Sequence, residues 1–116
     1  MKIVSVKDAP LSNPPMHYDV ESRALQGIEP SGFFNQLILG HSRFQPGGYR
    51  AGAEMRFDAI YYILEGELTV RTKDRTEILR QGDTVRFEMN EWSEVKNEGV
   101  SVTEILAILA PPPAKN

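Results

Sequence analysis

A histidine and an arginine at alternating positions, His41 and Arg43, are of residue types that could support acid–base chemistry. His41 and Arg43 lie in an extended stretch, so in a strand both side chains share one face. If that face points into the protein, His41 would move protons near neutral pH and Arg43 would anchor a carboxylate. If it points outward, both are solvated surface groups. The sequence leaves these two alternatives open.

Glu104 is a second candidate, because it lies within an otherwise largely apolar stretch at residues 102–109. A carboxylate buried there would serve as a general base. The alternative is that Glu104 is a charge on an edge strand, where it discourages pairing with other chains. The sequence does not decide between these roles.

The composition excludes several classes of function. The 116 residues are 41% hydrophobic and 25% charged, which is enough apolar material for a buried core. Thirteen Lys and Arg stand against sixteen Asp and Glu, with no basic run, so nucleic-acid binding is not expected. The absence of cysteine excludes disulfides, thiolate nucleophiles and cysteine-based metal sites. No apolar stretch approaches the roughly 20 residues of a membrane span or resembles a signal peptide, so we expect a cytoplasmic protein.

Short apolar stretches separated by turn residues dominate the chain from residue 33 onward. The predicted strands cover residues 33–44, 60–64, 67–72, 75–79, 84–87 and 101–109. A turn is expected at 45–48, where Gln-Pro-Gly-Gly stands. Before residue 33, prolines prevent a long helix, and we expect a short strand at 3–6 and one helical turn within 20–27. This pattern predicts a single all-β sandwich or barrel.

Two glycine-bounded segments resemble the two motifs of the cupin family, which are small β-barrels of the jelly-roll type. The first segment runs from Gly47 to Gly66, and the second from Gly82 to Asn97. The resemblance implies one jelly-roll barrel over residues 33–113 and a short tail at 114–116. Residues 1–32 would then form an N-terminal strand and linker that packs on the barrel or on a partner subunit. A homodimer is implied, because this segment of small cupins tends to join the sheet of a second copy.

The resemblance does not extend to the residues that hold a metal ion in the family. By the spacing of the motifs, those four positions fall on Ala53, Met55, Ala59 and Ser93. Alanine has no donor atom, a thioether is a soft ligand, and a serine hydroxyl is a weak one. We therefore expect no metal and no cofactor at this site.

Small side chains at these positions would leave space inside the barrel for a ligand. By strand alternation Tyr61 would face the same space, where its phenol would donate a hydrogen bond or act as a general acid. The alternative is a core tyrosine bonded to a backbone carbonyl. Trp92 would stack on a ligand or simply cover the core. The candidate catalytic residues are Tyr61, His41 and Glu104, and the candidate ligand-binding residues are Arg43, Met55, Trp92 and Ser93.

Three functions are compatible with these residues. The first is a metal-independent cupin that holds a small aromatic or carboxylated molecule, and acts on it as an isomerase, cyclase or lyase. The second is a metal-dependent dioxygenase or isomerase with relocated ligands, drawn from His41, Glu54, Asp58 or Glu104. The third is a dimeric interaction module without catalysis. The sequence does not decide whether the protein is an enzyme.

Overall fold

The computed structural model describes residues 1–12, 14–28 and 34–111. Phe33, where one predicted strand begins, and the tail at 114–116 lie outside this range. The elements are η1 (Val6–Asp8), β1 (Leu11–Ser12), β2 (His17–Ile28), β3 (Phe34–Glu54), β4 (Asp58–Glu65), β5 (Glu67–Thr72), β6 (Thr76–Arg80), β7 (Thr84–Phe87), β8 (Trp92–Lys96) and β9 (Thr103–Ala110). No helix among the described residues is long and apolar enough to cross a membrane.

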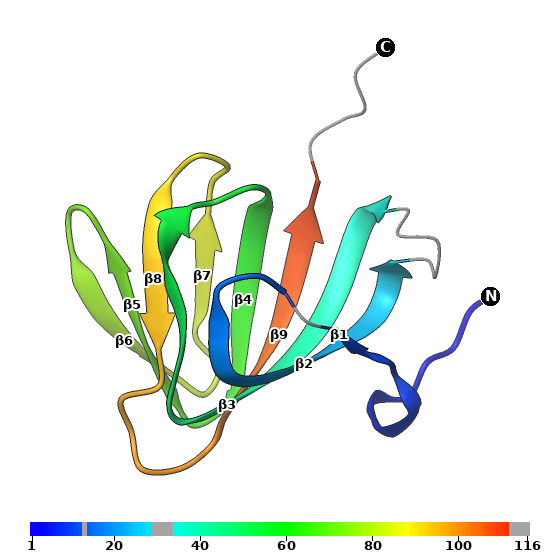
Figure 1. Ribbon diagram of the computed structural model, residues 1–116, viewed down its shortest axis with the longest axis horizontal. Coiled ribbons are helices and arrows are strands. Elements are labelled where there is room, and N and C mark those ends of the chain that lie inside the picture. The colour runs from blue at the N-terminus through cyan, green and yellow to red at the C-terminus, as the bar shows by residue number, and fades with distance from the viewer. Residues whose placement is uncertain (13, 29–33, 112–116) are drawn as a thin grey trace.

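The strands form one antiparallel sheet that curls into a nearly closed barrel (Figure 1). Its strand order is β6-β5-β8-β3-β9-β4-β7, with β2 on β3 and β1 on β2. Strands β6 and β7 end the path and leave the barrel open between them. The predicted all-β jelly-roll fold is confirmed.

A corner in β3 connects the two halves of the barrel. Residues 38–44 of β3 pair with β9, whereas residues 49–54 pair with β8. Between them Gly47 adopts φ +85°, and its N–H donates to the carbonyl of Asn97 at 2.8 Å. A Cβ on Gly48 would meet the Asp19 carbonyl oxygen at 2.4 Å, so glycine is required there. The predicted turn at 45–48 is therefore wrong as a chain reversal, because it is a bend within one long strand.

Three further local predictions differ from the structure. Residues 20–27 belong to β2 rather than to a helical turn, because pairing with β3 outweighs local propensity. Residues 3–5 form no strand, and a 3₁₀ turn begins at Val6. Strand β8 was not predicted, because its polar residues hide the alternation typical of a half-buried strand.

The core lies inside the barrel and is built from alternate residues of several strands. Strand β4 buries Ala59, Tyr61 and Ile63, while the residues between them face outward. Other strands add Phe44, Leu68, Val70, Phe87, Val95 and Ile105. This alternation decides which of the candidate residues reach the interior.

Candidate functional site

An apolar cavity of about 380 Å³ lies between β2, β3, β4 and β9. Its walls include Ile38, Phe44 and Ile105, together with the small residues Gly40 and Ala107. A volume of this size suits a small organic molecule, and ligand pockets of this kind are largely apolar with a few polar groups. The sequence placed a pocket beside Ala53 and Ala59, but neither residue lines this cavity, and nor do Met55, Trp92 and Ser93.

Polar groups reach this cavity from β2, β3 and β4. The buried hydroxyls of Ser22 and Ser42 share a hydrogen bond of 2.9 Å on its wall. Tyr61 is 6% exposed, lines the cavity, and meets the edge of the Phe87 ring at 5.5 Å between centroids. Tyr61 thus lies where the sequence placed it, facing a space that a ligand can fill.

His17 is the residue of this cavity best suited to proton transfer, and sequence reasoning did not select it. Its Nδ1 donates to the carbonyl of Pro15 at 2.8 Å, so Nε2 carries the free lone pair of the neutral ring. Burial lowers the pKa of His17 below 6.5, against the raising effect of the Pro15 hydrogen bond, and the charge of Arg50 lowers it further. A neutral imidazole with a fixed tautomer is a general base near neutral pH.

A β-bulge brings Arg50 into the barrel beside two of the motif positions. Arg50 pairs with Val95 and Ala53 with Ser93, so β3 has one residue more than β8 in this interval. Strict alternation along the sequence would place Arg50 on the outward face with Glu54 and Arg56. The bulge instead turns the Arg50 side chain inward, where it is only 7% exposed. The alternation of apolar and polar residues in a single sequence does not reveal such an extra residue.

Two of the positions that the sequence resemblance assigns to metal ligands, Met55 and Ser93, are therefore linked to a guanidinium group. Arg50 donates to the carbonyl of Ser93 at 2.8 Å and to its hydroxyl at 2.7 Å, and this hydroxyl donates to Met55 Sδ at 3.3 Å. The Arg50 group also stands 5.8 Å from the centre of the Phe87 ring. Within the described part of the chain no three His, Asp or Glu residues are grouped so that they could hold a metal.

His41, Arg43 and Glu104 come together, but on the outer face of the sheet. They alternate with Ser42 and Ile105, which line the cavity, and so point away from it. Glu104 lies 3.0 Å from Arg43 Nη1 and 3.7 Å from His41 Nε2. The three residues lie in a charged surface hollow that residues of the η1 segment also line. His41 and Arg43 thus lie on the outward face, but only Arg43 is a solvated group there, since His41 is buried at 7% exposure.

Trp92 also lies outside the cavity. Its indole covers Gly52 at the bulge, where an added Cβ would meet Cζ2 at 2.3 Å. The structure thus gives Trp92 a packing contact against the bulge that turns Arg50 inward.

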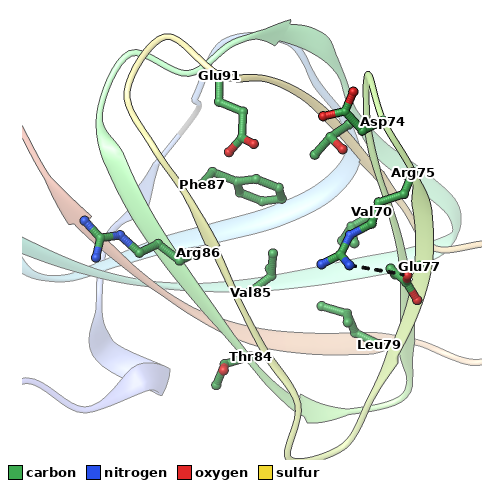
Figure 2. A pocket seen from close by; sticks show the side chains of 11 residues that line it. Val70, Asp74, Arg75, Glu77, Leu79, Thr84, Val85, Arg86, Phe87 and Glu91 are labelled. Atoms are coloured by element: carbon green, nitrogen blue, oxygen red, sulfur yellow. Dashed lines mark ion pairs between the residues drawn. The ribbon is translucent and has the colours of Figure 1, made fainter.

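A second, more polar groove of about 310 Å³ lies in the opening between β6 and β7. Figure 2 shows the Glu91 carboxylate directed toward the Phe87 ring, with Arg75 and Glu77 on the opposite wall. Arg75 and Glu77 form an ion pair of 4.0 Å, and the Arg86 side chain extends away from the groove. Phe87 separates this groove from Tyr61 and the apolar cavity.

The sequence model of the cupin domain family matches residues 40–109 of this chain. The chain belongs to the cupin family. A β-D-galactosidase of Mycobacterium tuberculosis, Rv1717, is 30% identical to this cupin over 115 residues, covering 99% of the chain and 98% of the relative.

Solved cupin structures resemble this cupin along nearly its whole length. A predicted oxalate decarboxylase from Thermotoga maritima has a TM-score of 0.79 at 21% identity, covering 96% of this chain and 100% of its own. The polyketide cyclase RemF from Streptomyces resistomycificus also has a TM-score of 0.79, at 20% identity. The match covers 100% of this chain and 84% of RemF. At these identities the likeness concerns the fold.

Proposed function

We propose that this cupin takes a small, largely apolar organic molecule into the cavity and performs acid–base chemistry on it without a metal ion. The observation that carries this proposal is the neutral His17 on the cavity wall, with its tautomer set by Pro15. Metal independence is supported by the donor set, because Ala53 and Ala59 supply no ligand atom and Arg50 brings a positive charge to Ser93.

The chemistry that suits these groups is proton abstraction next to a carbonyl. Nε2 of His17 accepts the proton, the electron pair of the C–H bond forms a C=C bond, and the carbonyl oxygen becomes an enolate. The Tyr61 hydroxyl stabilises this oxygen by donating a hydrogen bond. The fate of this enolate decides the type of enzyme. If the proton returns to another carbon, the enzyme is an isomerase; if the enolate expels a neighbouring leaving group, it is a lyase; if the enolate attacks a second carbonyl of the same molecule, it is a cyclase.

A carbon acid of suitable size tests this proposal without knowledge of the natural substrate. Incubation with 2-tetralone in D₂O should exchange its α-protons faster with the wild-type protein than with buffer, as followed by NMR. His17→Gln should lower the protein-dependent rate at least about tenfold, because general-base catalysis contributes about 10²–10⁴. Glu104→Gln, on the outer face, is the matched control and should retain the rate. Loss of exchange in the control with retention in His17→Gln would refute the assignment.

A second candidate is hydrolysis of a β-galactoside, as the name of the M. tuberculosis relative suggests. It is favoured by the groove of Figure 2, because the carboxylates of Glu91 and Glu77 both line it. Glycoside hydrolysis uses two carboxylates on either side of the scissile bond. Release of nitrophenol from 4-nitrophenyl β-D-galactopyranoside, abolished by Glu91→Gln and unchanged by His17→Gln, would establish this function. Retention of activity in both Glu91→Gln and Glu77→Gln would contradict it.

A further inference from the structure

Arg50 is a buried cation for which the described part of the chain supplies no anion. It is 7% exposed, yet none of the ion pairs among the described residues includes it. Its guanidinium donates to neutral oxygens alone: the hydroxyl and carbonyl of Ser93, and the carbonyl of Ala51 at 3.4 Å. Its Nε is buried and has no acceptor among the described residues.

This arrangement is energetically incomplete. A buried charge is strongly disfavoured unless an opposite charge and a full set of hydrogen bonds accompany it. Neutral oxygens satisfy part of the Arg50 group, and the Phe87 ring adds a weak cation–π attraction. Neither supplies a negative charge, and neither occupies Nε. A carboxylate is the group that would do both, because it matches the guanidinium edge with two parallel hydrogen bonds.

Arg50 does not line the cavity itself, but it neighbours two residues that do, His17 directly and Tyr61 through Phe87. His17 lies directly opposite Arg50 on the neighbouring strand, so the two side chains leave the sheet on one face at a spacing of about 5 Å between Cβ atoms. Phe87, below the guanidinium, touches Tyr61, which lines the cavity. Nε is buried, so an anion reaches it only when a neighbouring side chain moves. We infer that Met55 is the side chain that moves, because its thioether is flexible and is bonded to the same Ser93 hydroxyl as Arg50.

We propose that Arg50 anchors a carboxylate of the ligand, and that the substrate is therefore a small organic acid whose apolar body fills the cavity. This inference rests on the proposed function, because it places the ligand in the same cavity as His17. It assigns to Arg50 the attraction for anions that a metal cation would otherwise exert in a cupin. The carboxylate would cancel the buried charge.

Two probes of nearly equal shape separate charge from size. Binding of 2-naphthoate and of the neutral 2-naphthamide is measured by calorimetry with the wild-type protein. We expect the acid to bind at least about tenfold tighter than the amide. In Arg50→Met, which keeps the length and removes the charge, this preference should disappear while the amide still binds. Arg50→Lys keeps the charge but loses the paired N–H donors of the guanidinium, so it should retain a smaller preference for the acid. It replaces Arg50→Met in this test if Arg50→Met does not fold.

Two arginines outside the barrel core complete the test. Arg56 lines the cavity with an exposed side chain, and Arg43 lies on the outer face. Arg43→Met is the control and should retain the preference. Arg56 is the competing cation at the cavity, and loss of the preference in Arg56→Met alone would overturn the assignment to Arg50. Equal binding of both probes to the wild-type protein refutes the anchor but leaves the cavity as a binding site. Failure of both probes to bind refutes the proposed function as well.

Discussion

Arg50 and Ser93 are joined across β3 and β8 by two hydrogen bonds, one to the serine carbonyl at 2.8 Å and one to its hydroxyl at 2.7 Å. The same hydroxyl donates to the thioether of Met55. Ser93 is fully buried and Arg50 nearly so. The hydroxyl therefore holds the guanidinium in the barrel, at a position that the sequence resemblance assigns to a metal ligand.

Removal of that hydroxyl should destabilise the protein. In Ser93→Ala one Nη2 hydrogen of Arg50 loses its acceptor in a buried environment, and we expect a loss of about 1–3 kcal/mol in the free energy of unfolding. Urea unfolding followed by circular dichroism measures it. Ser101→Ala is the control, because this serine is exposed and should change the stability by less than about 0.5 kcal/mol. Equal stability of both variants would show that the buried bond contributes nothing.

The lowered pKa of His17 predicts how stability depends on pH. The unfolded chain takes up the proton near pH 6.5, whereas the folded protein takes it up at a lower pH because of burial. Between these two values the unfolded state binds more protons, so stability decreases as the pH falls through this window and is fully present above it. His17→Gln should flatten this part of the profile, as measured by urea unfolding between pH 5 and about 8. A profile identical to that of wild type would exclude the burial of a neutral His17.

Cavity filling distinguishes empty space from a packed core. Ala107 lines the cavity, so Ala107→Leu should fill it and prevent 2-naphthamide from binding, with little loss of stability. Ala59 is 1% exposed within the core, opposite Phe87 on β7, so Ala59→Leu should cost about 1–3 kcal/mol through overpacking. Calorimetry and urea unfolding measure the two effects. Unchanged probe binding in Ala107→Leu would place the ligand elsewhere.

The sequence was sufficient to predict the architecture and one wall of the cavity. Strand alternation in β4 correctly turns Tyr61 inward, because that strand has no irregularity before Ile63. Arg50 was missed because a single extra residue in β3 reverses the face of everything before it. His17 was missed because β2 was not recognised as a strand, and its partner β3 lies far along the chain. Both errors arise from long-range pairing, which one sequence does not reveal.

The outer face of the barrel carries apolar side chains that nothing in the described chain covers. Ile60 and Ile108 are paired neighbours on β4 and β9, and so are Tyr62 and Leu106. Tyr62 remains 41% exposed and Ile60 39%. At the N-terminus, Ile3 is 82% exposed. Large contiguous patches of exposed apolar surface generally mark interaction sites.

We propose that this face and the N-terminal segment form a homodimer. A two-fold contact would bury the same apolar patch on both copies, and the N-terminal residues would cover the partner. Light scattering at micromolar concentration should give twice the monomer mass for wild type. Deletion of residues 1–8 should weaken the dimer, and Tyr62→Lys should yield monomers because a charge would be buried at the centre of the contact. Ile78→Lys is the control, since Ile78 lies on the edge strand β6, outside the patch, and should leave the mass unchanged. A monomeric wild-type protein, or a dimer unaffected by Tyr62→Lys, would rule out this interface.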